Sequence, residues 1–339
     1  MKKSISVIIP VFNRESLLPL TLKSLLAQTC PADEIIVVDD GSTDSTVSIA
    51  ESFGGTVRVI RQANAGPAAA RNRGFKESQG EFIHFFDSDD LALPNKHEVQ
   101  LDVLERSGAD IAYGPWVKGE ITESGFNAEN HVLQQLGLPK GDLIRALLTN
   151  WSIVPHACLF RRSIVEKVGG FPEELFVAED QLMFLRCLLA GAKVMHSPET
   201  LELYRSNDAG KITASDPASK ARHFREWGRF LAIARNECLD KGIDPQEWFG
   251  FRQRAWQVEL DLKHAGIRNE ELISGLQAIN RGGLRRLSYF SHRSIRRKLE
   301  GIQQRLTGGR AHTDFQIGPL TENQLSGIER IFQKSESGS

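Results

Sequence analysis

The sequence predicts a doubly wound α/β domain with a mostly parallel, Rossmann-like sheet, followed by a helical C-terminal extension. Three observations predict this fold. Short β-branched runs alternate with helical stretches over the first 110 residues. Acidic clusters follow the second and the fourth of these runs, and open α/β sheets bind ligands beyond such strand ends. Beyond residue 206 the chain is helical and charged, with no convincing strand.

The first half has the order β-α-β-α-β-α-β. Nearly continuous apolar runs predict buried parallel strands, and the stretches between them predict the helices that cover the sheet. The expected strands are 4–11, 34–38, 57–61 and 81–86, and the expected helices are 15–28, one from about residue 44, and one from Gly66-Pro67.

The second half is less regular. A strand is expected at 111–114, a helix at 143–149, and a helix at 179–190 that Gly191 closes. Within 281–310, nine basic residues accompany one acidic residue, Glu300, and apolar residues are interleaved at roughly helical spacing. This pattern fits a basic amphipathic helix on an anionic membrane surface, and it also fits a solvated helix packed on the rest of the chain.

The composition is that of an ordinary globular protein. Of 339 residues, 40% are hydrophobic and 25% are charged, and the formal net charge of -1 gives no case for nucleic-acid binding. The cysteines lie far apart and form no CxxC pair, which predicts a reducing, cytoplasmic setting without structural zinc or disulfides. No stretch approaches the ~20 apolar residues of a membrane-spanning helix.

Carboxylates at the expected strand ends are the first candidate site. Asp87 and Asp89 stand two residues apart after a strand and can face one ion, and such oxygen ligands suit Mg²⁺ or Mn²⁺. Asp39 and Asp40 can accept hydrogen bonds from a base imide N–H or a ribose hydroxyl. Asp90 can assist the metal or cap the next element of the chain. The alternative for both clusters is a polar turn that opens a helix.

Other polar residues have weaker cases. Arg71 lies one turn into the helix that Pro67 starts, where a guanidinium can bind a phosphate through two hydrogen bonds. Its alternative is a hydrated helix face. His84 lies within an apolar strand and is interpreted as a core residue, and His156 is also interpreted as structural.

The sequence resembles the family 2 glycosyltransferases with the GT-A fold. The matching segments are 6–13, 36–44, 64–74, 85–90 and 169–172, followed by Glu179-Asp180. The resemblance covers about 4–205, and its motifs are jointly specific. Two positions depart from the family pattern: Gln181 replaces a usual aromatic residue, and a histidine often found after Tyr204-Arg205 is missing.

The resemblance implies roles for individual residues. Asp180, in the pair Glu179-Asp180, is the expected general base of a single displacement with inversion. At the start of a helix, Asp180 is favoured as a carboxylate by the helix dipole; its alternative is a helix-terminal acid. The resemblance also places Pro10, Val11, Asp39 and Asp40 around the nucleotide base, which is usually uracil. It places Arg71 at the base or the diphosphate, Asp87 at the ribose or the metal, and Asp89 at the metal.

The predicted protein is a cytoplasmic, Mn²⁺- or Mg²⁺-dependent glycosyltransferase, with peripheral membrane contact through 281–310 as an open question. Residues 1–210 form the catalytic domain, with a nucleotide-binding half at about 1–110 and an acceptor half at 111–210, and 211–332 form the helical extension before a disordered tail, 333–339. The expected donor is a UDP-hexose or UDP-aminohexose, and the expected acceptor is a glycan or lipid-linked hydroxyl.

Rival functions fit the sequence less well. A nucleotidyltransferase acting on a sugar phosphate typically has a Gly-rich, basic loop after the first strand, which 10–13 is not. Dinucleotide binding is disfavoured because no GxGxxG follows that strand. A non-catalytic nucleotide-sugar-binding scaffold is less favoured because the metal-type carboxylates and the base are both present.

Overall fold

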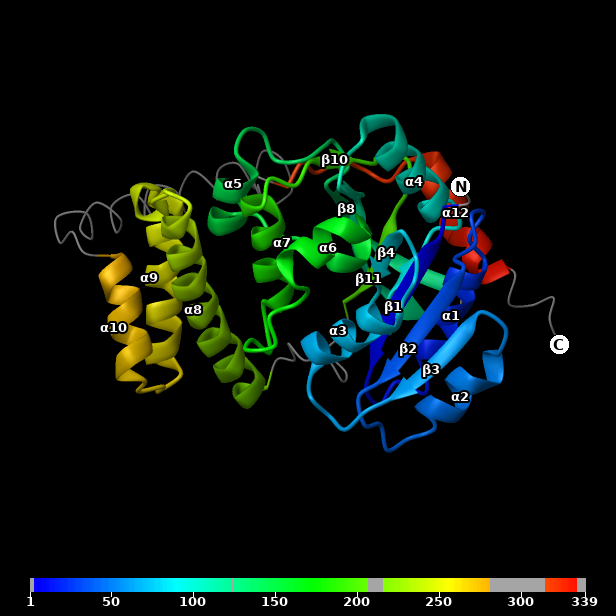
Figure 1. The fold of residues 1–339 in the computed structure, drawn as a ribbon, viewed down its shortest axis with the longest axis horizontal. Coiled ribbons are helices and arrows are strands. Elements are labelled where there is room, and N and C mark those ends of the chain that lie inside the picture. Colours follow the sequence, from blue (N-terminus) through cyan, green and yellow to red (C-terminus); the bar gives the residue numbers. More distant parts are fainter. Residues whose placement is uncertain (1–2, 123–124, 207–215, 281–314, 334–339) are drawn as a thin grey trace. The chain divides into compact units, whose positions relative to one another are not determined.

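The computed structural model describes residues 3–122, 125–206, 216–280 and 315–333 (Figure 1). The chain divides into two compact units. The larger comprises Met1–Leu138, Ile153–Asn207 and Gln316–Ser339, and the smaller comprises Pro139–Ser152 and Asp208–Phe315. Among the described residues, no helix has both the length and the apolar character needed to cross a membrane.

The larger unit is built on a seven-stranded sheet with the order β10-β6-β9-β4-β1-β2-β3. β1 to β4 are parallel, β6 and β10 are parallel to each other, and β9 runs antiparallel to β4 and β6. The doubly wound, mostly parallel sheet is thereby confirmed. The strands are β1 (Ile5–Val11), β2 (Glu34–Asp39), β3 (Val57–Arg61), β4 (Phe82–Phe85), β6 (Ile111–Tyr113), β9 (Cys158–Arg161) and β10 (Val194–His196).

Helices cover both faces of this sheet. Apolar residues of α1 (Leu18–Leu26), α2 (Thr46–Phe53) and α4 (Lys96–Ser107) pack in one core with alternate residues of β1 and β2. On the other face, α3 (Pro67–Glu77) packs against the opposite residues of the same two strands. The larger unit also contains α6 (Arg162–Val168) and α7 (Glu179–Leu189), and the helix expected at 179–190 therefore begins where the sequence predicted.

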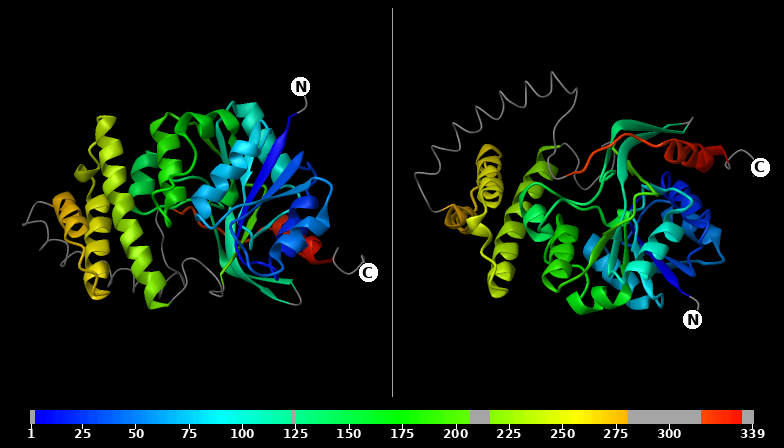
Figure 2. Two further views of the ribbon diagram at one scale, coloured as in Figure 1. Left: turned by 60° about the horizontal axis from the view of Figure 1, so that its bottom comes forward. Right: turned by 90° about the horizontal axis from the view of Figure 1, so that it is seen from above.

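A second sheet was not foreseen from the sequence. Its strands have the order β5-β11-β7-β8, and α12 (Glu322–Gln333) packs its apolar side chains against it. Figure 2 shows this C-terminal helix, in red, beside the β7–β8 hairpin. The sequence-based division places 316–332 in the helical extension, whereas the structure groups this segment with the sheets. The strands are β5 (Leu91–Ala92), β7 (Trp116–Thr122), β8 (Gly125–Leu133) and β11 (Glu202–Arg205).

The smaller unit is helical where it is described. It contains α5 (Leu143–Thr149), α8 (Pro217–Asp240), α9 (Phe249–His264) and α10 (Glu270–Ile279). Arg254 of α9 stacks on Trp227 of α8 at 4.2 Å and donates to the carbonyl of Leu147 in α5 at 2.8 Å. These contacts explain why α5, assigned from the sequence to the acceptor half, belongs to this unit. The predicted basic amphipathic segment 281–310 and all but the first residue of the predicted tail lie outside the described residues.

Candidate active site

The carboxyl ends of β1 and β2 meet at one edge of the sheet. Val11 and Asp39, the last residues of the two strands, are register neighbours, and both are buried. The loops beyond them are joined by hydrogen bonds: the Asn13 N–H donates to Ser42 Oγ at 2.9 Å, and Asn13 Oδ1 accepts from the Thr43 N–H at 2.8 Å. The predicted nucleotide-binding residues Val11 and Asp39 are thus brought together.

Asp40 is buried and fully engaged with the chain that leads into α3. Its Oδ1 accepts from Gln62 Nε2 at 2.8 Å and from the Ala65 N–H at 2.9 Å, and its Oδ2 accepts from the Gly66 N–H at 2.8 Å. Asp40 therefore shapes the entry to α3 through its own hydrogen bonds.

Pro10, also predicted at the nucleotide, is partly exposed in β1.

Arg71 joins three segments that are far apart in the sequence. Its Nη2 lies 2.8 Å from Asp87 Oδ1, and its Nη1 lies 2.8 Å from Glu179 Oε1. The guanidinium also lies 5.1 Å from the ring centre of Phe171. The neighbouring Asn72 holds the backbone of Phe171, donating to its carbonyl at 2.9 Å and accepting from its N–H at 2.8 Å. α3 therefore fixes the start of α7 beside the end of β4.

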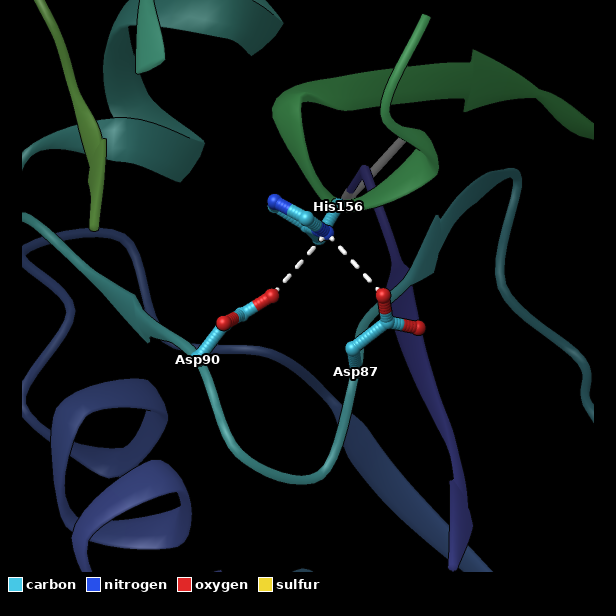
Figure 3. Close-up of side chains that lie close together, drawn as sticks. All are labelled: Asp87, Asp90 and His156. Carbon is cyan, nitrogen blue, oxygen red and sulfur yellow. Dashed lines mark hydrogen bonds and ion pairs between the residues drawn. The ribbon is translucent and has the colours of Figure 1, made fainter. Parts of the chain in front are cut away.

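Asp87, Asp90 and His156 converge in a small cluster (Figure 3). His156 Nδ1 lies 3.3 Å from Asp87 Oδ2 and 3.3 Å from Asp90 Oδ2. His156 stands two residues before β9, and because β9 is antiparallel to β4, the start of β9 lies at the same edge as the end of β4. Sequence reasoning missed this role because no motif announced the antiparallel strand.

The cluster suits a divalent metal ion. Its three ligand atoms lie within 4.8 Å of one another. Adjacent ligands of an octahedral Mg²⁺ or Mn²⁺ ion are about 3 Å apart, close to the separations from His156 Nδ1 to the two aspartates. Carboxylate oxygens suit these hard ions, and one imidazole nitrogen is compatible with Mn²⁺. The residues present therefore fit the predicted cofactor, although the ligand set differs from the predicted pair Asp87 and Asp89.

The cluster is strongly coupled electrostatically. Burial raises the pKa of Asp90 to about 8, even though His156 opposes this shift. Burial alone would lower the pKa of His156, but the carboxylates of Asp90 and Asp87 raise it to about 9. Burial disfavours the ionised form of Asp87 and would raise its pKa, yet Arg71 and His156 hold this pKa below the usual range. Asp90 and His156 therefore both favour their protonated forms near neutral pH, and a cation that binds to the cluster must displace protons from them.

Asp89 points to a different partner. Arg205 Nε donates to Asp89 Oδ2 at 3.2 Å, and Arg205 Nη2 makes a closer contact with the same oxygen. Arg14 Nε lies 3.8 Å from that oxygen. The Arg205 N–H also donates to Asp90 Oδ1 at 2.8 Å. Because β11 pairs with β5, Arg205 lies beside the acidic loop, and Asp89 Oδ2 could bind a metal only when this ion pair opens.

Glu179 and Asp180 begin α7 and have different environments. Glu179 is buried against Arg71, whereas Asp180 is partly exposed and accepts from the Gln181 N–H at 2.7 Å. Ala178 precedes them with φ +65°, a strained conformation for a residue with a Cβ atom. Burial raises the pKa of Asp180, and it raises that of Glu179 to about 7. For Asp180 this is the opposite of the direction expected from the helix N-terminus, because burial outweighs Arg71 and the hydrogen bonds from Gln181, which lower the pKa.

Comparisons with known proteins agree with this fold. The pattern described as Glycosyl transferase family 2 matches residues 6–169. An uncharacterized glycosyltransferase of Escherichia coli K12, YibD, is 32% identical over 289 residues, which cover 80% of this chain and 81% of the relative. Residues 1–349 of S. aureus TarS, solved with UDP-GlcNAc, share the fold with a TM-score of 0.63 and 19% identity, over 99% of this chain and 92% of TarS 1–349.

A second similar structure is the mannosyltransferase PcManGT of Pyrobaculum calidifontis, solved with GDP-Man and Mn²⁺. It has a TM-score of 0.52 and 18% identity, over 83% of this chain and 80% of PcManGT. The two solved structures show the shared fold, and the family model and the Escherichia coli relative show that the chain is a glycosyltransferase. The chain belongs to glycosyltransferase family 2. This membership favours glycosyl transfer over the nucleotidyl transfer considered above.

Proposed function

We propose that this enzyme transfers a hexose or aminohexose from a UDP-linked donor to an acceptor hydroxyl in one inverting displacement. The observation that carries the proposal is the link through Arg71, which joins Asp87 in the metal-type cluster to Glu179 at the start of α7. Asp180 is the next residue on that helix. A leaving-group site and a base are therefore held in one rigid arrangement.

The donor end is proposed at the strand ends. Val11, Pro10 and Asp39 border the position of the nucleotide base, and Asp40 shapes the loop that leads to Arg71. Asp87, Asp90 and His156 would hold Mn²⁺ or Mg²⁺, which when bound supplies positive charge to the departing diphosphate. Structures of two similar proteins, one with UDP-GlcNAc and one with GDP-Man and Mn²⁺, support a nucleotide-sugar donor and a divalent ion.

Asp180 is the proposed general base. Its side chain is partly exposed and its pKa is raised by burial, and a carboxylate with a raised pKa takes a proton from an attacking hydroxyl more readily. Glu179 is less suited to this role because Arg71 occupies its carboxylate. Glu179 instead orients Arg71 toward Asp87.

The acceptor is proposed to be a glycan or lipid-linked hydroxyl, and the setting is proposed to be the cytoplasm. Both follow from the family rather than from a described contact. Inversion is tested by the anomeric configuration of the product, determined by NMR spectroscopy, and a retained configuration would exclude the single displacement.

The donor site is tested by calorimetric binding of UDP and a panel of UDP-sugars, with Mn²⁺ and with EDTA. We expect Asp87→Ala to lose the Mn²⁺-dependent binding, whereas Asp102→Ala, an exposed aspartate paired with Arg106, should bind like the wild type. Asp89→Ala separates the two ligand sets: lost metal binding would show that Asp89 belongs to the metal site. Donor binding that neither EDTA nor Asp87→Ala affects would refute the metal-assisted proposal.

A further inference from the structure

Gln181 departs from the family pattern, and its side chain makes a two-bond clamp. Gln181 Nε2 donates to the Ile153 carbonyl at 2.9 Å, and Gln181 Oε1 accepts from the Ile153 N–H at 3.1 Å. Both residues are buried, at 5% and 3% exposure. Ile153 has no strand or helix around it to satisfy its backbone groups. A single amide side chain therefore replaces the hydrogen bonds that secondary structure would supply.

The clamped segment carries His156. Only Val154 and Pro155 separate Ile153 from His156, and proline restricts the backbone between them. On the far side, Gln100 Nε2 donates to the Ala157 carbonyl at 2.8 Å. The position of His156 Nδ1 against the two aspartates is thus set by hydrogen bonds on both flanks.

We infer that Gln181 is a positioning residue that couples the start of α7 to the Asp87–Asp90–His156 cluster. Gln181 is adjacent to Asp180 and donates its own N–H to that carboxylate at 2.7 Å. One residue therefore contacts the proposed base through its backbone and holds the segment of a proposed metal ligand through its side chain. The metal part of this inference rests on the proposed function, whereas the placement of His156 does not.

Three variants of the full chain separate positioning from general stability. Gln181→Leu removes both hydrogen bonds at similar volume, and Gln181→Glu can still accept from the Ile153 N–H but cannot donate. Gln324→Leu is the matched control, because Gln324 of α12 is also buried, donates to the Thr200 carbonyl at 3.2 Å and accepts from the Thr321 N–H at 3.0 Å. Each leucine variant leaves a backbone carbonyl and a backbone N–H without their side-chain partner and should lower stability.

The first measurement is NMR of metal-free protein labelled with ¹⁵N-histidine. The signal of His156 is the one lost in His156→Gln. We expect that signal to shift or broaden in Gln181→Leu, to change less in Gln181→Glu, and to stay in place in Gln324→Leu. An unchanged His156 signal in Gln181→Leu would overturn the inference, whether or not the protein binds metal.

The second measurement is titration with Mn²⁺ alone, with free Mn²⁺ followed by EPR. Loss of a group that orients a metal ligand typically lowers metal affinity about 10- to 100-fold. We expect a loss of about 10-fold or more in Gln181→Leu, a smaller loss in Gln181→Glu, and an affinity within about twofold of wild type in Gln324→Leu. Equal losses in both leucine variants would show that Gln181 only stabilises the fold. If wild type binds no Mn²⁺, the metal proposal fails, and the NMR result still decides the role of Gln181.

Discussion

Removing the guanidinium of Arg71 should destabilise the protein, and it should do so more at pH 8 than at pH 5. Arg71→Met leaves two carboxylates without the cation that contacts each at 2.8 Å. The Glu179 side chain is 9% exposed and that of Asp87 is 28% exposed. Solvent therefore screens the Arg71–Asp87 ion pair more than the Arg71–Glu179 ion pair. Breaking a buried ion pair costs about 3–5 kcal/mol, and most of this loss should come from Glu179.

The pH dependence follows from the pKa of Glu179. Burial and Asp180 raise this pKa to about 7 in spite of Arg71, and removing Arg71 should raise it further. When the pKa of a carboxyl group is higher in the folded state than in the unfolded state, the group does not destabilise the fold at a pH below its unfolded-state pKa. The protein loses stability as the pH rises through the folded-state pKa. Glu179 can take up a proton at pH 5, and the loss there should be smaller than at pH 8.

Urea unfolding followed by circular dichroism at the two pH values measures this effect. Arg73→Met is the control, because Arg73 lies on the same helix but is 51% exposed and pairs with Glu77 at 3.3 Å, an interaction worth about 0.3–0.5 kcal/mol. Glu179→Gln in the Arg71→Met background should restore part of the stability. The reasoning fails if Arg71→Met costs no more than Arg73→Met, or if its cost is the same at both pH values.

Three further predictions concern the site and its support. Asp180→Asn should keep donor binding while transfer falls about 10²- to 10⁴-fold, measured by calorimetry and product formation; unchanged transfer would exclude Asp180 as the base. Gly74→Ala should lower the free energy of unfolding by about 1–3 kcal/mol, because the new Cβ would lie 2.4 Å from Ile8 Cγ2; a neutral result in urea unfolding would mean that α3 can move aside. Mn²⁺ affinity should rise between pH 7 and 9, because metal must displace the protons on Asp90, with a pKa of about 8, and on His156, at about 9; a flat EPR titration would argue against this cluster.

The parallel half of the fold was predictable because each of its elements has a strong local signal. β3 (Val57–Arg61) has the predicted bounds, and β1 and β2 differ from the predictions by one residue each. Their β-branched runs are buried by helices on both faces, so local pattern and tertiary environment agree. Asp39 and Asp87 could then be placed at one edge of the sheet from strand order alone.

The second sheet and β9 were missed for a physical reason. β7 and β8 both mix buried residues with exposed ones, and both contain charged and polar side chains. Neither strand therefore has a continuous apolar run. β9 has only four residues, and its antiparallel direction depends on long-range pairing that its own sequence does not encode. The roles of His156 and Arg205 depend on these elements, and sequence reasoning therefore left both residues outside the site.

The distribution of cations decides which carboxylates of the site are free to react. Arg71 forms ion pairs with Glu179 and with one oxygen of Asp87, and Arg205 forms an ion pair with Asp89. Adjacent acids with different environments can take different chemical roles, because the environment sets the pKa of each. Of the pair at the start of α7, Glu179 is the buried partner of a cation, and Asp180 is the one with solvent access and a hydrogen bond from a backbone N–H. The ion pair between Arg71 and Glu179 therefore supports the proposal, first made from the family resemblance, that Asp180 is the base.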